Sequence, residues 1–264
     1  MAGEVLHTES ALPSEGGRFQ PDAGSAVLWQ TLRDVVSVLV TQTGRAELDI
    51  VDVGGGTGGF AVPLGSLGHT VTVIDPSPDS LAAAQRRAAE AGVPLRAVQG
   101  DVSDLAAATG TAGADLILCH SVLEYVDSPE AAMSAIAGIL RPDGAVSVLA
   151  ASAVAAVIHR VLTGRFDEAR RLIAATGTEP DPFGGGPGVT ARRFTLPDIV
   201  GLIEKAGLRP GPGHGVRVFT DLVPSMLTGA EPGAAAALLA LEEAASAHPA
   251  FRGMATQFHV LGFR

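Results

Sequence analysis

The stretch Leu48–Gly59, LDIVDVGGGTGG, decides the fold of this chain. Its first half contains a β-branched run, which is typical of a buried parallel strand. Its second half is almost pure glycine, and residues without a Cβ let the backbone turn sharply and let a ligand lie directly against it. A candidate helix follows from Phe60, and the N–H groups at its start point toward that ligand. The stretch therefore predicts a strand–loop–helix unit that binds a nucleotide-like cofactor.

Length and composition restrict the class of protein. The 264 residues are enough for one α/β domain with a sizeable core, and a content of 47% hydrophobic and 17% charged residues is typical of globular proteins. A net charge of −10 argues against a broad nucleic-acid footprint, although it allows a local basic patch. The single cysteine, Cys119, excludes an internal disulfide framework and suits a reducing compartment. We find no signal peptide and no membrane-spanning run, and we expect a cytoplasmic protein.

Strands and helices alternate through the first 150 residues. We expect residues 1–22 to form a flexible arm and residues 23–264 a single domain. The periodicity predicts helices over Ser25–Val40, Phe60–Leu67, Asp79–Ala91 and Pro129–Leu140, with Gly44 at or after the end of the first. The predicted strands are Asp49–Val53, Thr70–Ile74, Leu95–Val98, Asp115–Cys119 and Ala145–Ala150, the last after a tight turn at Pro142–Gly144. Right-handed crossovers then give a doubly wound, mostly parallel α/β sheet of Rossmann-like type.

The pattern changes after residue 151. We expect a helical segment over Ser152–Thr176, a Pro/Gly-rich loop over Gly177–Val189, and helices over Thr195–Ala206 and Gly233–Ala247. Two further strands, Val216–Phe219 and Gln257–Phe263, are predicted to pair antiparallel at one edge, which brings the sheet to seven strands. Residues 152–195 would form a helical lid or substrate wall.

The glycine loop fits two cofactors. Gly54, Gly56 and Gly59 satisfy G-x-G-x-x-G, the dinucleotide fingerprint, while Asp52 with Gly54, Gly56 and Gly58 satisfies D-x-G-x-G-x-G. Asp75 lies at the end of the second strand, where a carboxylate accepts both hydroxyls of a ribose in either cofactor. The alternative role for Asp75 is a cap of the helix that follows. The loop and this carboxylate therefore leave NAD and S-adenosylmethionine open.

Asp101 separates these two cofactors. An acid just after the third strand accepts a hydrogen bond from the adenine amino group of S-adenosylmethionine, and the N–H of Val102 donates to the ring. The NAD-binding fold requires no acid there. An ordinary loop aspartate is the competing interpretation.

The fourth strand ends at Cys119 and His120. We interpret Cys119 as a small buried hydrophobe. His120 lines the cofactor cleft or acts as a base, and Glu124 and Tyr125 follow on the cleft side. The seven histidines show no H-x-x-x-H pair and no adjacent acid cluster, so we predict no metal site.

Taken together, these motifs resemble those of the class I S-adenosylmethionine-dependent methyltransferases. More narrowly, the chain resembles the bacterial tRNA 5-carboxymethoxyuridine methyltransferase family, which esterifies the carboxylate of a modified wobble uridine. The stretches that carry the resemblance are Leu28–Gln30, Asp52–Gly58, Asp115–His120, Val122–Val126, Leu140–Gly144, Gly164–Asp167, Gly215–Asp221 and Leu241-Glu242.

The resemblance implies an enzyme that uses S-adenosylmethionine and releases S-adenosylhomocysteine. By position, the residues that would contact the cofactor are Gly54, Gly55, Asp75, Asp101, Val102 and His120, and we add Asp52, Gly56, Gly58 and Pro76 from the same two loops. Two departures stand out. Gly24 occupies the position where the family has a cofactor-binding arginine, and the family's lysine-rich segment is replaced by residues 177–193, whose only basic residues are Arg192 and Arg193. Fewer phosphate contacts weaken RNA binding, so we expect a small-molecule acceptor, with tRNA as the alternative.

The acceptor is expected to be an oxygen nucleophile, with a carboxylate as the favoured group. Candidate residues to hold an anionic acceptor are Arg165, Arg192, Arg193 and Arg217, and Tyr125 is a further substrate-binding candidate. A carboxylate needs no general base, whereas a phenol or amine would make His120 or Glu124 the catalytic residue. An NAD-dependent oxidoreductase is a distant alternative that leaves Asp101 unexplained. A non-enzymatic cofactor-binding protein is a third possibility, prompted by Gly24.

Overall fold

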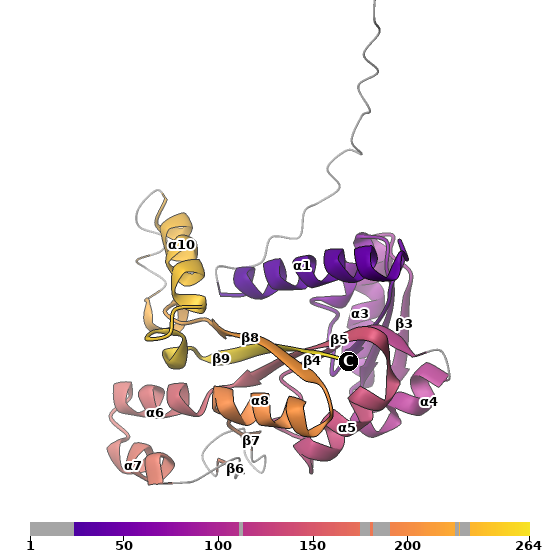
Figure 1. Ribbon diagram of the computed structural model, residues 1–264. Helices are drawn as coiled ribbons and strands as arrows, with labels where there is room; N and C mark the ends of the chain where they lie inside the picture. The colour runs from indigo at the N-terminus through magenta and orange to yellow at the C-terminus, as the bar shows by residue number, and fades with distance from the viewer. Residues whose placement is uncertain (1–23, 111–112, 175–179, 182–190, 225–226, 228–232) are drawn as a thin grey trace, which may run out of the picture.

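A seven-stranded sheet forms the centre of the computed structural model, which describes residues 24–110, 113–174, 180–181, 191–224, 227 and 233–264 (Figure 1). The strand order is β3-β2-β1-β4-β5-β9-β8. The first five strands of this order run parallel, whereas β9 is antiparallel to both of its neighbours, β5 and β8. The bounds are β1 Asp49–Val53, β2 Thr70–Asp75, β3 Leu95–Gln99, β4 Ala114–His120, β5 Leu140–Ala151, β8 Arg209–Val216 and β9 Gln257–Phe263.

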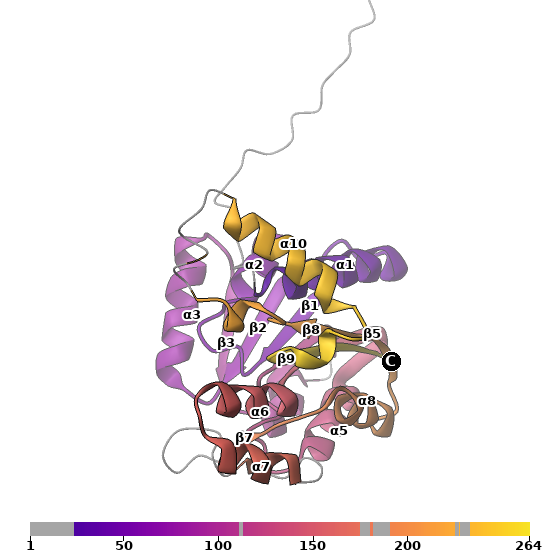
Figure 2. The ribbon, with the colours of Figure 1, turned by 90° about the vertical axis from the view of Figure 1, so that its left-hand side faces the viewer.

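Helices cover both faces of the sheet, as the turned view in Figure 2 shows. One face carries α1 (Ala26–Thr43), α2 (Ala61–Ser66) and α3 (Pro78–Glu90), and their apolar residues form one core cluster with the sheet. The other face carries α4 (Leu105–Thr109), α5 (Pro129–Ile139) and α8 (Leu196–Lys205), which form the second cluster. The sheet is therefore the middle of three layers, and the two clusters lie on opposite sides of it.

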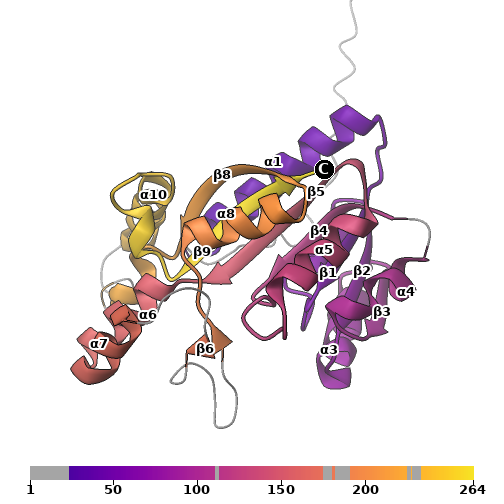
Figure 3. The same ribbon diagram turned by 60° about the horizontal axis from the view of Figure 1, so that its bottom comes forward.

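The remaining elements gather where β5 and β8 end. Helices α6 (Ala153–Leu162) and α7 (Phe166–Ala174) pack on each other, and the short strands β6 (Pro180–Asp181) and β7 (Ala191–Arg192) pair beside them (Figure 3). Helix α10 (Ala234–Ser246) lies against β8 and α1. The short 3₁₀ turns used below are η1 (Val102–Asp104), η3 (Thr220–Leu222) and η4 (Arg252–Met254). No helix among the described residues is long and apolar enough to cross a membrane.

The predicted doubly wound sheet is confirmed, and most elements begin and end within two residues of their predicted bounds. Gly44 ends α1, with a φ of 67° and its N–H bonded to the carbonyl of Val40, 3.1 Å away. Thr195 caps α8 through a reciprocal hydrogen-bond pair with Asp198. These elements were readable because local chemistry, a cap or a glycine, marks their ends.

Three predictions differ from the structure. The strand predicted over Val216–Phe219 is wrong: β8 covers Arg209–Val216 and ends where Arg217 adopts a φ of 60°. Its sequence, RPGPGHGV, has the prolines and glycines of a loop, but an outermost strand tolerates prolines because one side needs no ladder donor. Strand β5 begins at Leu140 and bulges through the predicted turn, with Asp143 at a φ of 65°. The helical segment over Ser152–Thr176 is two helices, broken at Gly164.

Two other features complete the comparison with the sequence. The structure adds η1 and α4 between β3 and β4, which the periodicity did not indicate. The predicted arm over residues 1–22 and nearly all of the Pro/Gly-rich loop over 177–189 lie outside the described residues.

Candidate functional site

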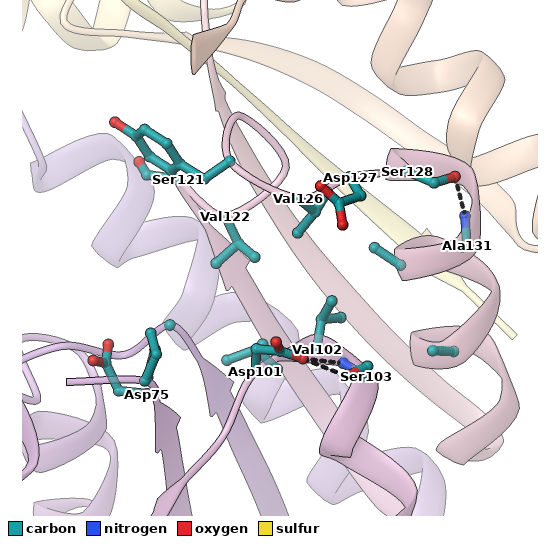
Figure 4. A pocket seen from close by; sticks show the side chains of 16 residues that line it. Asp75, Asp101, Val102, Ser103, Ser121, Val122, Val126, Asp127, Ser128 and Ala131 are labelled. Atoms are coloured by element: carbon teal, nitrogen blue, oxygen red, sulfur yellow. Dashed lines mark hydrogen bonds between the residues drawn. The ribbon is translucent and has the colours of Figure 1, made fainter. Parts of the chain in front are cut away.

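A cavity of about 860 Å³ opens at the carboxyl ends of β1, β2, β3 and β4. Of the four residues predicted at strand ends, Asp75 and Asp101 line it together with Gly54, whereas Asp52 and His120 do not. Figure 4 shows Asp75 and Asp101 on one side of the cavity and Val122 and Val126 on the other. Parallel strands bring their carboxyl ends to one edge of a sheet, which explains the convergence. The full lining is Val53, Gly54, Asp75, Pro76, Asp101, Val102, Ser103, Ser121, Val122, Tyr125, Val126, Asp127, Ser128, Ala131, Ala132 and Ala135.

The glycine loop after β1 has no space for side chains at its first two positions. A Cβ on Gly54, whose φ is +63°, would lie 2.5 Å from Val122 Cγ2, and one on Gly55 would lie 2.6 Å from Asp52 Cγ. The loop is anchored to the neighbouring strand, because the N–H of Gly54 donates to the carbonyl of Ile74 at 2.7 Å. The sequence requires glycine here because of this close packing and the left-handed backbone.

Asp75 joins the glycine loop to the end of β2. Its Oδ2 accepts from the N–H of Gly56 and its Oδ1 from the N–H of Ser77, each at 2.9 Å. Ser77 is the residue that caps α3, through the N–H of Ser80, so the alternative role of Asp75 as the helix cap is wrong. Each carboxylate oxygen keeps a second acceptor site. The carboxylate is therefore fixed in orientation and able to accept two more hydrogen bonds at the cavity wall.

Asp101 begins η1, on the same side of the cavity. Its Oδ1 accepts from the N–H of Ser103 at 2.7 Å and from the hydroxyl of Ser103 at 2.6 Å. These two hydrogen bonds lower the pKa of Asp101. Val102 is buried and lines the cavity beside it. Asp101 therefore caps the turn at η1 and lines the cavity at the same time.

Asp52 lies beneath the loop and is 3% exposed. Burial and the charge of Asp75 raise its pKa to about 7. Its carboxyl group packs against Gly55, and it is not among the residues that line the cavity. Asp52 therefore packs against the glycine loop on the side away from the cavity, and it does not reach the cavity itself.

A second, smaller cavity of about 380 Å³ adjoins the first. The two share Ser121 and Tyr125. Its lining is mostly polar and comprises Ser121, Glu124, Tyr125, Ala151, Arg193, Arg217, Thr256 and Gln257. Two arginines and a neighbouring hydroxyl group make this cavity suited to an anionic group.

Arg217 projects from the end of β8 toward α1. Its Nε donates to both carboxylate oxygens of Asp221 at 3.0 Å, and the hydroxyl of Thr256 donates to the same carboxylate at 2.7 Å. Gly24 lies directly against this arginine: a Cβ built on Gly24 would come within 2.8 Å of Arg217 Nη1. The glycine at the position where the resemblance leads us to expect an arginine therefore leaves room for the Arg217 side chain.

The other two predicted arginines lie elsewhere. The guanidinium of Arg192 donates to the carbonyls of Val126 and Asp127 and so ties β7 to the loop after β4. Arg165 lies in the turn between α6 and α7, its side chain is 61% exposed, and it pairs with Glu168 at 3.9 Å. Neither is among the residues that line the two cavities.

Glu124 lines the second cavity, whereas His120, which precedes Ser121, is not among the residues that line either cavity. Burial lowers the pKa of His120 to about 3, so the ring is neutral near pH 7. Glu124 is 2% exposed, and its Oε1 accepts from the N–H of Ala151 at 2.8 Å while burial raises its pKa. His120 touches Phe60 edge to face, with ring centroids 5.2 Å apart. Both side chains are held firmly, and a low pKa makes His120 a weak base.

The sequence did not single out Ser121, Thr256 or Gln257, which line the second cavity. Ser121 follows the last residue of β4 and has a φ of 55°. Gln257 begins β9, and its amide donates to the hydroxyl of Ser121 at 3.1 Å. An antiparallel strand begins at the edge where its parallel neighbours end, so the start of the last strand was the available signal. Among the described residues no cluster of side chains could hold a metal ion.

Comparison with known proteins gives a consistent result. Residues 51–148 match the family described as "Methyltransferase domain". The chain is 32% identical over 205 residues to the tRNA 5-carboxymethoxyuridine methyltransferase of Escherichia coli K12, covering 74% of this chain and 71% of that protein. It is 38% identical over 98 residues to a ubiquinone biosynthesis O-methyltransferase of Methylobacterium nodulans, which covers 37% and 38% of the two chains.

A solved structure shares the fold. The magnesium protoporphyrin IX methyltransferase of Synechocystis PCC 6803, determined with bound S-adenosylhomocysteine, superposes with a TM-score of 0.56 at 17% identity. The alignment covers 94% of this chain and 90% of that one.

Proposed function

This chain belongs to the class I S-adenosylmethionine-dependent methyltransferases, and from that premise we propose that it methylates a carboxylate oxygen of a small-molecule acid. The observation that carries the proposal is the second cavity, where Arg193 and Arg217 line a polar space that adjoins the larger cavity. A guanidinium binds a carboxylate with directed, charge-assisted hydrogen bonds. The two shared residues, Ser121 and Tyr125, mark where the acceptor would meet the cofactor.

The larger cavity has the donors and acceptors that S-adenosylmethionine needs. We assign the ribose hydroxyls to Asp75, whose carboxylate is oriented by two backbone amides. We assign the adenine to Asp101 and Val102. The close approach of the loop, where a Cβ on Gly54 would collide with Val122, supports a ligand lying against bare backbone. The NAD alternative is set aside because the family is that of methyltransferases.

The protein's contribution to the reaction is positioning. When bound, S-adenosylmethionine supplies a methyl group activated by its sulfonium. Arg193 and Arg217 would hold the acceptor beside the larger cavity, so that a carboxylate oxygen could take the methyl group as the carbon–sulfur bond breaks. The products are a methyl ester and S-adenosylhomocysteine. No proton is transferred, so neither His120 nor Glu124 is needed as a base, which agrees with the low pKa of His120.

The wall of the second cavity comes in part from residues 152–195, which we propose as the lid or substrate wall of a single domain. Arg193 contributes its side chain to the cavity, and Phe194 donates its N–H to the carbonyl of Ala151 at 2.8 Å. This backbone bond ties the segment to the end of β5.

A tRNA acceptor is the second candidate, and the relative from Escherichia coli favours it. The carboxylate of a modified wobble uridine would use the same two arginines. The sequence departs from the family's lysine-rich segment, and the net charge of −10 offers little general attraction to RNA phosphates.

One experiment decides between the acceptors. The purified protein is incubated with S-adenosylmethionine carrying a radiolabelled methyl group and a whole extract, which is then separated into tRNA and small-molecule fractions. Label that mild alkali releases from the small-molecule fraction supports the proposal. Alkali-labile label in tRNA supports the second candidate. Label that resists alkali in both fractions contradicts carboxyl methylation.

The arginines provide a direct test once an acceptor is found. We expect Arg217→Gln and Arg193→Gln each to raise the KM for the acceptor by about tenfold to a hundredfold, since a charged hydrogen bond contributes about 1.5–3 kcal/mol. The KM for S-adenosylmethionine should stay within about twofold. Arg87→Gln, on the exposed face of α3, is the matched control. An unchanged acceptor KM in both variants would remove these residues from the acceptor site.

A further inference from the structure

Glu124 is a buried carboxylate that the proposed reaction does not use. It lies between β4 and α5, is 2% exposed, and lines the second cavity together with Arg193 and Arg217. Its Oε1 accepts from the N–H of Ala151 at 2.8 Å, whereas its Oε2 is buried and has no hydrogen-bond partner among the residues that the structure describes. One oxygen of the side chain is therefore fixed to β5, and the other is left for a further donor.

A carboxylate oxygen in this position needs a donor. Buried polar groups in folded proteins are nearly always hydrogen-bonded, and a buried acceptor without a donor is most costly when it is charged. Burial raises the pKa of Glu124, but hydrogen bonds from backbone amides and the charge of Arg193 act in the opposite direction and favour the ionised form. Because the side chain lines a cavity, a bound molecule can supply the missing donor.

Both arginines of the second cavity have an acid close to them. The Nε of Arg217 donates to both carboxylate oxygens of Asp221 at 3.0 Å, so the charge of this arginine is balanced by a neighbour. Arg193 shares the cavity wall with Glu124, and its positive charge acts on that carboxylate. Two guanidinium groups and two carboxylates thus meet at this site. Such a site is complementary to a ligand that itself carries both signs of charge, more than to a simple anion.

We propose that the acceptor is an acid that also carries an ammonium group, and that Glu124 accepts a hydrogen bond from this ammonium while the arginines hold the carboxylate. The substrate class is therefore a zwitterion of the amino-acid type. This inference rests on the proposed methylation of a small-molecule carboxylate, and it names the second group that the acceptor must have. Glu124 then determines specificity and takes no part in bond formation, because an analogue without the ammonium leaves its buried oxygen unpaired.

The labelled ester made by the wild-type protein tests the ammonium group. The protein is incubated with the small-molecule fraction of an extract and S-adenosylmethionine labelled in its methyl group, and the products pass over a cation exchanger at low pH. The methanol that mild alkali releases is then counted in the retained and unretained fractions, so that the remaining sulfonium cofactor does not contribute.

We expect the alkali-released label in the retained fraction, because an ester that carries an ammonium group is a cation at low pH. Treating the extract with acetic anhydride beforehand, which turns amines into neutral amides, should abolish the labelling. Alkali-labile label in the unretained fraction, or labelling that survives acetylation, overturns the ammonium group and leaves carboxyl methylation standing. Absence of alkali-labile label from both fractions contradicts the proposed function itself, so the two failures are distinguishable.

The Glu124→Gln variant tests the residue. Glutamine keeps the shape of the side chain and an oxygen that can accept from Ala151, but it removes the charge. At limiting acceptor we expect the rate of ester formation to fall by about tenfold to a hundredfold, the effect of one charged hydrogen bond. The KM for S-adenosylmethionine should stay within about twofold, which a general loss of structure would not allow. Glu90→Gln, exposed at the end of α3, is the matched control and should keep the wild-type rate. A wild-type rate in Glu124→Gln would remove Glu124 from the acceptor site.

Discussion

Among single residues, Asp75 gives the most direct test of cofactor binding. Two backbone amides orient its carboxylate and leave one acceptor site on each oxygen. In Asp75→Asn one of those oxygens becomes a donor, and we expect the Kd for S-adenosylhomocysteine to rise by about tenfold to a hundredfold in calorimetry. Asp79→Asn, four residues on and exposed at the start of α3, should bind as the wild type does. Wild-type affinity in Asp75→Asn would exclude the ribose role.

Asp52 and His120 make the free energy of unfolding depend on pH in opposite directions. The folded-state pKa of Asp52 is raised from 3.8 to about 7, so the native state binds more protons than the unfolded state between these values, and stability falls as the pH rises. The pKa of His120 is lowered from 6.5 to about 3, so its contribution falls as the pH drops below 6.5. The two slopes oppose each other between about pH 4 and pH 6.5.

In Asp52→Asn the contribution of Asp52 is gone, so the loss of stability that His120 causes on acidification should be seen directly. We expect the melting temperature of this variant to drop more steeply than that of the wild type on acidification from about pH 6.5 to about pH 4, since the opposing aspartate is gone. Above about pH 7 the variant should melt higher than the wild type, because an ionised carboxylate no longer has to be buried. Parallel curves of melting temperature against pH would show that Asp52 does not titrate in this range.

Glu242 shows how one element fixes a site residue on another. From α10 its buried carboxylate accepts hydrogen bonds from the N–H groups of Val218, Phe219 and Thr220 and from the hydroxyl of Thr220. This segment immediately follows Arg217, so α10 holds the turn from which the arginine projects. The sequence contained Leu241-Glu242 as part of the resemblance, but only the packing of α10 on β8 gives it this role.

The Glu242→Gln variant tests this anchor. An amide cannot accept at both of its terminal atoms, so some of the donors lose their partner, and we expect unfolding to become easier by about 1–3 kcal/mol. Denaturant titration measures the change. The neighbouring Glu243 is exposed on the same helix, and Glu243→Gln should leave stability within about 0.5 kcal/mol. Equal stability of the two variants would mean that the carboxylate is not the anchor.

At the scale of the whole molecule, the larger cavity is built from four strand ends and the loops and helices that follow them. A ligand that binds there should stabilise the entire fold, by about 2.7 kcal/mol at a hundred times its Kd. We expect S-adenosylhomocysteine to raise the melting temperature in a thermal scan and NAD at equal concentration to leave it unchanged. A shift with NAD alone would contradict the assignment of the cavity.

The strands and helices of the first half of the chain could be predicted because the residues that mark them lie next to one another in the sequence. Each strand is a short apolar run, and capping serines mark where the helices begin, as Ser77 does for α3 and Ser128 for α5. Asp75 and Asp101 could be placed together from their positions in the chain, since parallel strands end at one edge of the sheet, whereas His120, predicted beside them, does not line their cavity. The second half lacks such signals: β8 carries the composition of a loop and is a strand because β9 pairs with it.

The sequence by itself determined the doubly wound sheet, the glycine loop and the acids at its strand ends, because backbone sterics and hydrophobic periodicity act over a few neighbouring residues. Only the tertiary structure decided which arginines share a cavity, that Glu124 lines it with them, and why Gly24 stands against Arg217. Those contacts join residues that lie far apart in the chain, as Gly24 and Arg217 do. No local pattern encodes them, because they depend on the order in which β4, β5, β9 and β8 lie side by side.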